Sequence, residues 1–556
     1  MTLPPSLSSS AYLDTFARDH LPPPHLWPTI EFTTPDLHHP ERLNAATELI
    51  DRPTSAFGAD RPALRTPAGE TWTYGELRKR ANQVAQVLTE DLGLVPGQRV
   101  MLRSPNNPWT VASWLGVLKA GGVVVTLMAA LRAREIAPVA ERTGPALALV
   151  DHRCAEDVHA VRDTVLPSLR VVEFGGAGPD DLVARATAKS GEFTAVDTSA
   201  DDVALLAPTS GSTGAPKITM HFHRDILSID DTFGRHVLRL LPDDLVACSA
   251  PFAFTFGLGM LVVFPLRAGA CALLTEAATP LGMAELVERQ GVTVLATAPT
   301  AYKAILREGR EQQLAGLRAG VSAGEHIPVG TWEQLRDRTG LRVIDGIGAT
   351  ELLHIFLSAA GDDIRPGATG KPVPGFRATV LGPDGTELGP GEPGRLGVIG
   401  PVGCRYLDDE RQKDYVVDGW NVTGDIFHRD EDGYFHYHAR GDNMIVSSGY
   451  NIGGPEVEAA IDTHPDVLEC AVVGRADAER GEVVCAFVVL RDGASGDAAK
   501  AKEIQDHVKQ VIAPYKYPRD VRFRESLPRN ASGKLQRFAL RAAVEDEQAT
   551  TAAVEH

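Results

Sequence analysis

Apolar positions in the first part of the chain follow a helical spacing in some stretches and a strand spacing in others. The helical spacing is clearest at 74–92, where Leu77, Ala81, Val84 and Leu88 form one apolar stripe. Thr73 and Glu76 make a capping box before this stripe, and Gly93 follows it. The pattern predicts a helix over 74–92 with its apolar side against a core.

Short, continuously apolar runs alternate with helical segments through much of the chain. Runs of this kind are typical of parallel strands that are covered on both faces. The expected strands are 100–103, 123–127, 146–150, 203–207, 218–222, 245–249, 270–274, 292–297, 319–322 and 343–345, with a further helix at 108–120. We therefore expect an α/β fold in which two stacked α/β layers form one large N-terminal body. The proline-rich segment 1–60 is expected to lie across it as an arm, with a short helix at 44–50.

The pattern changes after residue 370. Short strands punctuated by glycine-containing hairpin turns, such as 383–385 and 432–433, predict a small β-barrel or β-rich subdomain at about 370–438. Beyond 442 the chain has its own helices, at 455–463 and 499–512, and its own strand at 483–490. These elements predict a small α+β domain. The predicted domains are 1–441 and 442–556.

Length, charge and cysteine usage narrow the functional classes. A chain of 556 residues is too long for one core. A formal charge of −18 argues against a nucleic-acid or anionic-membrane binder, and the longest apolar stretch, 256–274, is interrupted by proline, arginine and glycines. The six cysteines form no C-x-x-C pair, and no signal peptide is visible, so we expect free thiols and a cytoplasmic location. Whether the chain forms a homodimer is left open.

The segment 208–217 has the composition of a phosphate-binding loop between two strands. Its glycines free backbone N–H groups to face an anion, its hydroxyls add donors, and Lys217 adds a positive charge. Pro216 breaks the Walker A spacing, and a Ser/Thr/Gly-rich segment is otherwise most often an ordinary loop. The candidate nucleotide-binding residues of this loop are Thr209, Ser210, Gly211, Ser212, Thr213, Gly214 and Lys217.

Further segments downstream combine glycine with charged or hydroxyl side chains. They are 322–325 (Ser-Ala-Gly-Glu), 345–351 (Asp-Gly-Ile-Gly-Ala-Thr-Glu), 420–425 (Trp-Asn-Val-Thr-Gly-Asp), 440–442 (Arg-Gly-Asp), 449–451 (Gly-Tyr-Asn) and 528–534 (Pro-Arg-Asn-Ala-Ser-Gly-Lys). Each of them alone is most easily interpreted as a turn. In this order along one chain they resemble, together with the loop at 208–217, the signature motifs of the acyl-adenylate-forming superfamily of acyl-CoA synthetases, adenylation domains and luciferases. The resemblance extends over nearly the whole chain.

The resemblance implies a role for each segment. Thr350 would bind phosphate, Glu351 and Thr213 would hold Mg²⁺, and Lys534, on a mobile C-terminal lid domain, would be the catalytic adenylation lysine. The remaining nucleotide, hinge and coenzyme A positions implied by the resemblance are Gly324, Glu325, Asp345, Gly346, Asp425, Arg440, the hinge Asp442, and Gly449 beside the pantetheine arm. The chain departs from the family at Ile347, where a tyrosine that stacks on adenine is usual, and at Asn530, where threonine is common.

The chemistry of this family explains why cations are needed. A carboxylate must approach the α-phosphate of ATP although both are anionic, and each pair of unit charges repels by about 4 kcal/mol at about 4 Å and an effective dielectric near 20. Mg²⁺ and Lys534 would offset this repulsion, and the acyl-adenylate would then be attacked by a thiol. Water would hydrolyse this mixed anhydride, which gives a closing lid a chemical purpose.

The acid is suggested by the segment 252–257, where phenylalanine occupies alternate positions. On a strand these rings would share one face, and by itself such a pattern is usually core packing. The stretches 254–259 and 346–358 resemble benzoate-CoA ligases, and 15–23 resembles the 2-aminobenzoate-CoA branch. The resemblance implies that the acid contacts Phe254, Thr255, Phe256, Gly257, Ala323, Gly348 and His354. A lone histidine is otherwise more often a core residue. No acidic residue occurs at 252–257, which disfavours an amino-acid substrate.

Two histidine pairs, His221 with His223 and His436 with His438, would each share a face of a strand. No third ligand is evident near either pair, so we expect no zinc site.

The favoured hypothesis is an ATP- and Mg²⁺-dependent aryl-CoA ligase for benzoate or an ortho-substituted relative, such as 2-aminobenzoate or 2-hydroxybenzoate, with coenzyme A as acceptor. A second hypothesis is a stand-alone enzyme that loads the aryl group onto a carrier protein. A third is a nucleotide-binding regulator without turnover.

Overall fold

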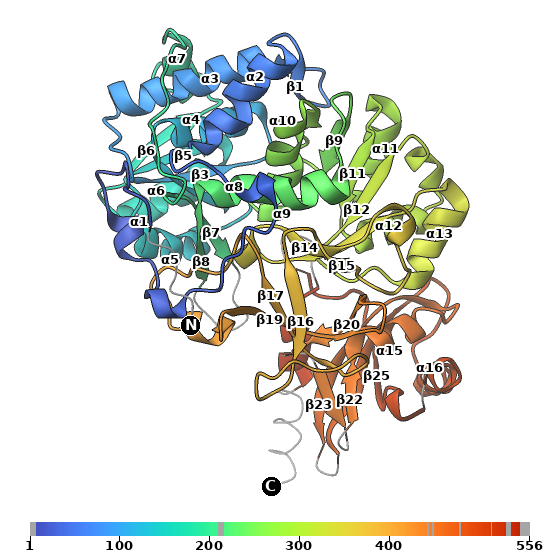
Figure 1. Cartoon of the computed structure of the whole chain (residues 1–556). Coiled ribbons are helices and arrows are strands. Elements are labelled where there is room, and N and C mark those ends of the chain that lie inside the picture. The colour runs from blue at the N-terminus through green and yellow to red at the C-terminus, as the bar shows by residue number, and fades with distance from the viewer. Residues whose placement is uncertain are drawn as a thin grey trace. The chain divides into compact units, whose positions relative to one another are not determined.

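A computed structural model describes residues 7–209, 216–441, 444–447, 450–477, 480–512, 514–529 and 535–544. The chain divides into two compact units (Figure 1). The first contains residues 1–378 and 397–422, and the second contains 379–396 and 423–556. Each unit is described by itself. The predicted boundary at 441/442 stays a prediction, because residues 442 and 443 lie outside the described part.

The first unit contains a nine-stranded sheet in the order β15-β14-β13-β12-β11-β9-β10-β1-β2. Its strands are β1 (Pro62–Arg65), β2 (Thr71–Thr73), β9 (Leu245–Cys248), β10 (Cys271–Leu273), β11 (Val294–Thr297), β12 (Ala319–Ser322), β13 (Ile344–Gly348), β14 (Ile355–Ser358) and β15 (Lys371–Pro372). The pairs from β13 to β1 are parallel, and antiparallel strands complete both edges. The parallel arrangement is the one that the apolar runs predict.

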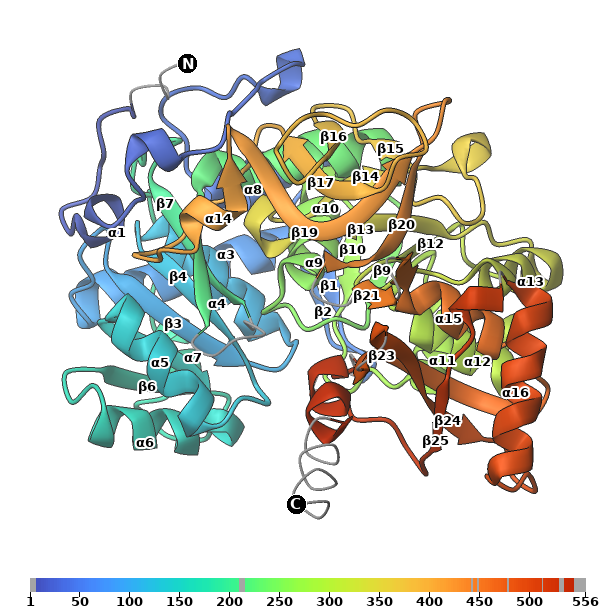
Figure 2. The same cartoon turned by 90° about the horizontal axis from the view of Figure 1, so that it is seen from below.

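The same unit contains a six-stranded sheet in the order β6-β5-β3-β4-β7-β8. Its strands are β3 (Arg99–Ser104), β4 (Val123–Met128), β5 (Leu147–Asp151), β6 (Arg170–Phe174), β7 (Val203–Thr209) and β8 (Lys217–Phe222). All pairs are parallel except β7 with β8, where Thr209 faces Lys217 across the ladder. Figure 2 shows α5 and α6 beside the strands of this sheet. The two sheets with their helices are the two α/β layers that the sequence predicts.

The helices of the first unit are α1 (Phe16–Asp19), α2 (Arg52–Phe57), α3 (Tyr74–Gln86), α4 (Pro108–Lys119), α5 (Ala133–Thr143), α6 (Ala155–Thr164), α7 (Leu182–Thr187), α8 (His223–Ile229), α9 (Thr255–Leu258), α10 (Phe264–Ala268), α11 (Pro280–Gln290), α12 (Pro299–Arg307), α13 (Val329–Thr339) and α14 (Gln412–Tyr415). The capping box predicted before α3 is present, since Thr73 and Glu76 exchange both hydrogen bonds. Helices α11, α12 and α13 pack on the nine-stranded sheet through one apolar core cluster.

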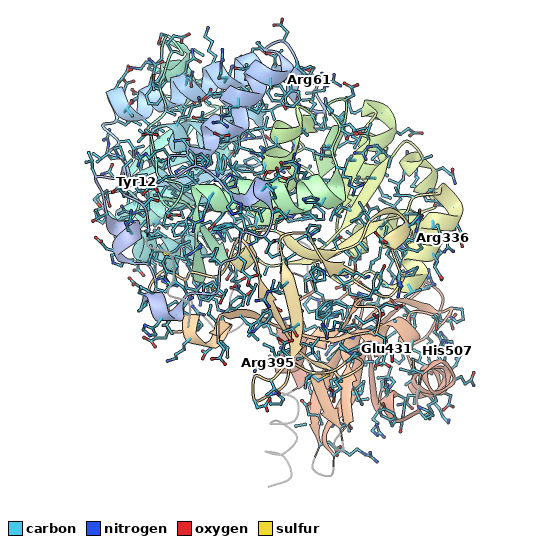
Figure 3. The ribbon with its side chains drawn as sticks, viewed as in Figure 1. Tyr12, Arg61, Arg336, Arg395, Glu431 and His507 are labelled. Atoms are coloured by element: carbon cyan, nitrogen blue, oxygen red, sulfur yellow. The ribbon has the colours of Figure 1, made fainter. Side chains whose placement is uncertain are left out.

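Two further segments confirm what the sequence predicts. The short helix expected at 44–50 is a π-helical turn at Thr47–Asp51, which continues into α2. The N-terminal arm lies along the first unit: the hydroxyl of Tyr12 (labelled in Figure 3) donates a 2.9 Å hydrogen bond to the carbonyl of Val203. Farther along the arm, Ile30 pairs with Gly400.

The second unit is built from strands of up to 11 residues and two described helices. One sheet has the strand order β16-β17-β19-β18, with β20 paired to β19. Its strands include residues that are assigned to the first unit and residues that are assigned to the second, and they lie in the predicted β-rich segment. A second sheet, β22-β21-β24-β23 with β25 on β24, belongs to the C-terminal segment. The bounds are β16 (Arg377–Leu381), β17 (Gly394–Ile399), β18 (Val416–Val417), β19 (Trp420–Arg429), β20 (Phe435–Arg440), β21 (Met444–Ser447), β22 (Tyr450–Gly453), β23 (Val467–Asp477), β24 (Gly481–Leu490), β25 (Asp520–Phe523), α15 (Gly454–Ile461) and α16 (Ala498–Val511).

One arrangement that the sequence allows is absent, and one local prediction is wrong. The segment 252–257 is not a strand, because the N–H of Phe252 bonds Asn106 Oδ1 at 2.7 Å and the N–H of Phe254 closes a turn onto the carbonyl of Pro251 at 3.0 Å. Its rings therefore do not share a strand face. His223 likewise does not share a strand with His221, because β8 ends at Phe222 and His223 begins α8.

All six cysteines are free, four of them buried, as the sequence predicts. None of the helices in the described part of the chain combines the length and the apolar character needed to cross a membrane.

Candidate active site

The nine-stranded sheet has a topological switch point between β9 and β11. The chain runs from β9 to β10 on one side and then returns to β11 on the other side of β9. Open α/β sheets bind ligands outside the carboxyl ends of the strands at such a point. Ser249 and Thr297, which lie at these two ends, are joined through their hydroxyl oxygens at 2.7 Å. The phenylalanine-rich segment 252–257 follows β9 and therefore begins at this switch point.

His354 lies in a cluster of aromatic rings, which we call the aromatic cluster: Phe233, Phe256, Phe264 and His354. The His354 ring centroid is 5.3 Å from that of Phe233, 5.5 Å from that of Phe256 and 4.7 Å from that of Phe264. The ring is 3 % exposed, and neither nitrogen makes a hydrogen bond of good geometry, although the backbone of Phe256 lies close enough to oppose the effect of burial on its pKa. Burial lowers the pKa of His354 to about 3, so the imidazole is neutral at physiological pH. The cluster thus offers one donor and one acceptor in apolar surroundings.

The backbone around His354 requires close approach. A Cβ on Gly259 would lie 2.5 Å from Cδ2 of His354, so only glycine fits there. Leu353, just before the histidine, has a φ of +66° as the backbone turns from the 3₁₀ helix Thr350–Leu352 into β14. The predicted contact residues Phe254, Thr255 and Phe256 are half-buried, and Gly257 is buried beside them. The structure thus brings Phe256 against His354.

Polar atoms without partners lie where the last residue of β12 pairs with the second residue of β13. Asp345 pairs in register with Ser322, and both Asp345 Oδ1 and Ser322 Oγ are buried without a hydrogen bond. Burial raises the pKa of Asp345 to about 8. A buried polar atom without a partner is costly, so this pair fits a ligand that carries its own donors and acceptors, as the edge of a purine does.

The other predicted nucleotide positions on or after these strands are placed as follows. Ala323 is buried directly after β12, Gly324 is exposed with a φ of +91°, and Glu325 is half-buried. Gly346 is buried within β13, and Gly348 is exposed at its end. They lie on, or directly after, the two strands that contain Ser322 and Asp345.

Thr350 and Glu351 form the start of the 3₁₀ helix and are half-buried. The hydroxyl of Tyr406 donates to Glu351 Oε1 at 2.5 Å, and Lys217 Nζ donates to the Tyr406 oxygen at 3.2 Å. Lys217 also lies 4.9 Å from the centroid of the Tyr406 ring. The structure therefore joins Lys217, at the end of the candidate phosphate loop, to Glu351 through one tyrosine.

The carbonyl of Thr350 forms a hydrogen bond with a buried histidine. His221 Nε2 lies 2.8 Å from this carbonyl oxygen, which can only accept, so Nε2 carries the proton. Burial lowers the pKa of His221 to about 4. Its Nδ1 lies 3.9 Å from Asp225 Oδ2, and that carboxylate is paired at 2.9 Å with Arg405. His221 is therefore a structural partner of Thr350.

In the second unit, Asp425 and Arg440 are cross-strand partners on β19 and β20. Arg440 NH1 lies 3.6 Å from Asp425 Oδ1. The aspartate side chain is 11 % exposed and the arginine side chain 50 % exposed, so the pair presents a guanidinium beside a largely buried carboxylate. Both residues are among the nucleotide positions that the family resemblance implies.

Several predicted site residues lie outside the described part of the chain. They are Ser210, Gly211, Ser212, Thr213, Gly214, Asp442, Gly449 and Lys534. Their predicted roles stay predictions. Thr209, at the end of β7, is described and half-buried, and it faces Lys217.

The histidines His436 and His438 have a third histidine beside them, which the sequence analysis missed. His428 Nδ1 lies 2.8 Å from His438 Nε2, and His436 Nε2 lies 3.1 Å from Asp430. The signal was available, because β19 and β20 form a hairpin that pairs His428 with His436. These groups satisfy one another in pairs, and we assign no metal to them.

One group in the described residues has the spacing of metal ligands: His464, Asp466 and Glu503. Lys500 Nζ bonds Asp466 at 2.5 Å and Glu503 at 2.6 Å, so an ammonium already neutralises both carboxylates. Acidic groups paired with lysine are ordinary surface chemistry, and we assign no metal here.

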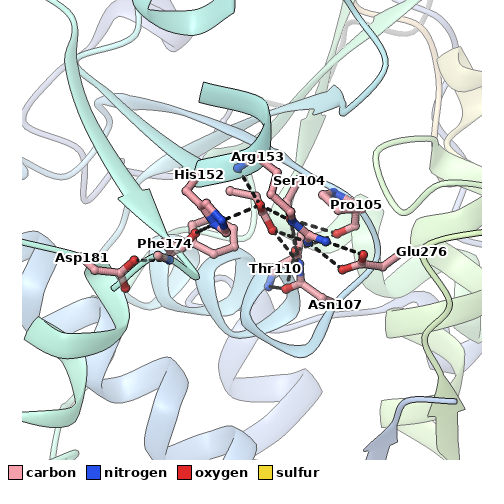
Figure 4. A network of polar contacts seen from close by, with 11 residues as sticks. Ser104, Pro105, Asn107, Thr110, His152, Arg153, Phe174, Asp181 and Glu276 are labelled. Carbon is pink, nitrogen blue, oxygen red and sulfur yellow. Dashed lines mark hydrogen bonds and ion pairs between the residues drawn. The ribbon is translucent and has the colours of Figure 1, made fainter. Parts of the chain in front are cut away.

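The six-stranded sheet has its own switch point, between β3 and β5, and protein groups fill it (Figure 4). Asp151, at the end of β5, accepts from Arg153 at 2.7 Å, and Arg153 forms two hydrogen bonds of 2.7 and 2.8 Å to Glu276, which follows β10 of the other sheet. Asn107 Nδ2 also donates to Asp151. This network links the two layers.

A cavity of about 360 Å³ lies at the opposite, amino ends of β3, β5 and β6, next to Leu92 and Arg170. The Arg170 guanidinium is engaged with the carbonyl of Leu92 at 2.6 Å. No predicted site residue lines this cavity, and we place the candidate site at the carboxyl ends instead.

The sequence does not predict that Tyr406 and His221 contact residues of the candidate site. Tyr406 is more than 50 positions from Glu351 in the chain, and no short motif joins them. His221 was considered only as a metal ligand with His223. Both side chains reach the site because β8 pairs with the segment around Tyr406, where Thr219 and Tyr406 form an antiparallel bridge.

The fold, with its large α/β unit and small α+β segment, and the order of these sites define an adenylate-forming enzyme. A family model described as "AMP-binding enzyme" matches residues 51–405, and one described as "AMP-binding enzyme C-terminal domain" matches 456–534. The chain belongs to the AMP-binding enzyme family, and it is an acid–CoA ligase that forms AMP.

Its relatives include enzymes for aromatic acids. The benzoate–CoA ligase of Thauera aromatica is 35% identical over 518 residues, which is 92% of this chain and 98% of that protein. The crystal structure of the anthranilate CoA ligase AuaEII in complex with anthranoyl-AMP superposes with a TM-score of 0.87 at 30% identity, covering 93% of this chain and 100% of that one. A benzoate CoA ligase from Burkholderia xenovorans LB400 has a TM-score of 0.82 at 29% identity, with 90% and 100% covered.

Proposed function

We propose that this enzyme is an ATP- and Mg²⁺-dependent aryl-CoA ligase for benzoate or an ortho-substituted benzoate, such as 2-aminobenzoate or 2-hydroxybenzoate. The observation that carries the proposal is His354: a neutral imidazole, buried among three phenylalanine rings, whose nitrogens make no hydrogen bond of good geometry. Flat apolar rings suit an aromatic acid, and the imidazole supplies a hydrogen-bond partner for a ring substituent or a carboxylate. The likeness to benzoate and anthranilate CoA ligases supports the same substrate class.

The nucleotide would lie at the carboxyl ends of β12 and β13. Asp345 and Ser322 would meet the edge of adenine, and Asp425 with Arg440 would bind ribose and phosphate. Glu351, with Thr213, would hold Mg²⁺, which supplies charge neutralisation to the phosphates when it is bound.

The reaction has two steps. A carboxylate oxygen of the acid attacks the α-phosphorus of ATP, the bond to the β-phosphate oxygen breaks, and pyrophosphate leaves. Lys217, Thr350 and Lys534 would stabilise the charge that develops on the phosphate oxygens. The thiol of coenzyme A then attacks the acyl carbon, the carbon–oxygen bond to the phosphate breaks, and AMP leaves. Gly449 would give the pantetheine arm access.

The direct test is thioester formation from ATP, coenzyme A and a panel of about ten acids, followed by mass spectrometry. We expect benzoate and its ortho-amino and ortho-hydroxy derivatives to have the highest kcat/KM, and medium- and long-chain fatty acids to have the lowest. Turnover of fatty acids alone would refute the assignment of an aromatic acid.

The acceptor needs its own comparison. Thioester formation with free coenzyme A should exceed transfer to a phosphopantetheinylated carrier protein at equal concentration. Transfer to the carrier alone would favour the loading-enzyme alternative, and binding of ATP without pyrophosphate release for any acid would favour the regulator.

A further inference from the structure

Tyr406 is held rigidly beside the candidate metal ligand. The N–H of Met220 donates to the carbonyl of Arg405 at 2.8 Å, and the N–H of Leu407 donates to the carbonyl of Ile218 at 2.9 Å, so the backbone on both sides of Tyr406 is fixed to β8. The tyrosine is fully buried, and its ring meets Tyr415 edge-on at 5.8 Å. The hydroxyl therefore cannot move without disturbing the six-stranded sheet.

The protons around the Tyr406 hydroxyl have one consistent arrangement. An ammonium can only donate, so the Tyr406 oxygen accepts from Lys217 at 3.2 Å. The tyrosine proton then goes to Glu351 Oε1, 2.5 Å away.

This arrangement has a consequence for Glu351. The terminal torsion of a glutamate is broad and roughly two-fold, so a carboxylate on a half-buried turn can present either oxygen to a ligand. A hydrogen bond on Oε1 removes that freedom. Carboxylates that ligate metals are commonly fixed in this way by hydrogen bonds from partners that do not touch the metal.

We propose that Tyr406 is a positioning residue for the metal site: its hydroxyl holds Glu351 Oε1, assigns Oε2 to Mg²⁺, and keeps Lys217 in line with that carboxylate. The inference rests on the proposed function, in which Glu351 holds the cation. It adds a residue about 190 positions from the phosphate loop, on a segment that lacks any motif of its own.

The test compares wild type with Tyr406→Phe, which removes only the hydroxyl and keeps the ring. Tyr302→Phe is the matched control, because Tyr302 is also fully buried in the first unit, and its hydroxyl bonds the carbonyl of Leu295 in the core at 3.2 Å. Binding of Mn²⁺ in the presence of ATP and without acid is followed by electron paramagnetic resonance. The Mg²⁺ dependence of acid-dependent pyrophosphate exchange is measured in parallel.

For Tyr406→Phe we expect the half-saturating metal concentration to rise by about tenfold, at the lower end of the loss typical for such partners. The KM of the acid should change less than about twofold, and exchange should recover at saturating Mg²⁺, because only the metal ligand is misoriented. Tyr302→Phe should keep the wild-type metal dependence. An unchanged metal dependence in Tyr406→Phe, or a loss that excess Mg²⁺ does not restore, would overturn the proposal.

A double variant guards against a general loss of structure. If Tyr406 acts through Glu351, adding Tyr406→Phe to Glu351→Gln should weaken Mn²⁺ binding no further, and additive losses would contradict the proposal. The binding readout also separates this inference from the substrate assignment. Weakened Mn²⁺ binding in an enzyme that activates no aromatic acid would keep the role of Tyr406 and reject the proposed function.

Discussion

Three side chains of the candidate site contain buried polar atoms without a hydrogen-bond partner. Asp345, Ser322 and His354 each have a buried oxygen or nitrogen without a hydrogen bond, although most buried polar atoms in folded proteins are satisfied. Such atoms cost stability in the free enzyme. They are therefore positions where a substitution should separate stability from activity.

Asp345→Asn should stabilise the free enzyme at high pH. The folded pKa of Asp345, about 8, is raised above the unfolded value of 3.8, so its contribution to stability is complete below about pH 4 and is lost as the pH rises through 8. Asparagine is never ionised, so at pH 9 the free energy of unfolding of the variant should exceed that of wild type by roughly 1–3 kcal/mol. At pH 6 the difference between the two proteins should be much smaller. Urea unfolding at the two pH values measures this.

The same variant should bind ATP more weakly above about pH 8, where Asp345 is ionised in wild type, because an amide is a poorer acceptor than a carboxylate. Identical pH dependences of unfolding for the two proteins would show that Asp345 is not the buried acid described here.

His354→Leu should change substrate preference. It removes two buried ring nitrogens, so we expect the free energy of unfolding to rise by about 1 kcal/mol, while kcat/KM for 2-aminobenzoate falls relative to that for benzoate. The preference of wild type should not change between pH 6 and pH 9, because the pKa of His354 is about 3. Competition between the two acids, read by mass spectrometry, measures the ratio. An unchanged ratio would remove His354 from the substrate site, and Phe264→Leu serves as an apolar control within the aromatic cluster.

The antiparallel pair β7–β8 and the 3₁₀ helix at Thr350 are the elements that organise the candidate phosphate site. The sequence predicts both strands, because each is a continuous apolar run. It does not predict that β8 also carries His221 to the Thr350 carbonyl or pairs with the segment of Tyr406, because these contacts join residues about 130 and 190 positions apart. The segment 252–257 is not a strand for a related reason: Asn106, far away in the sequence, takes the hydrogen bond of Phe252 that a strand would have used.

Substitution of His221 tests whether the contact between β8 and the Thr350 carbonyl matters for adenylation. His221→Leu keeps the apolar bulk but removes the donor to Thr350, so adenylation should fall by about tenfold or more, and His221→Gln should retain part of it through its amide N–H. The pyrophosphate exchange rate is the measurement. His223→Leu is the matched control: His223 is equally buried, but it contacts Tyr12 and the backbone of Ala45, so its loss should lower thermal stability without a selective loss of exchange. Equal effects of the two leucine variants would contradict a specific role for His221.

The whole molecule combines a large α/β unit with a C-terminal segment that would carry Lys534. The fold class follows from the sequence because continuous apolar runs and period-3.6 patterns depend only on local spacing. The candidate nucleotide residues followed mainly from the family resemblance. The aromatic cluster could be predicted only in part, because Phe233 and Phe264 reach His354 through tertiary packing that no local pattern encodes.

At this scale the central variant is Lys534→Ala. We expect acid-dependent pyrophosphate exchange to fall by about a hundredfold or more, because the positive charge at the developing phosphate charge is removed, while ATP binding measured by calorimetry stays within about threefold. Lys516→Ala, which removes an ammonium paired with Glu456 in the same unit, should leave exchange near the wild-type rate. Exchange that survives in Lys534→Ala would mean that another group supplies this charge.

Activation of the acid through an aryl-adenylate is tested most directly by following an oxygen isotope from the acid into the nucleotide. Benzoate labelled with ¹⁸O in both carboxylate oxygens is turned over with ATP and coenzyme A, and the nucleotide product is analysed by mass spectrometry. If the acid oxygen attacks the α-phosphorus and the thiol later breaks the acyl carbon–oxygen bond, the AMP carries one ¹⁸O and the thioester keeps the other. Unlabelled AMP, or ¹⁸O found in inorganic phosphate together with ADP, would contradict activation of the acid through an aryl-adenylate.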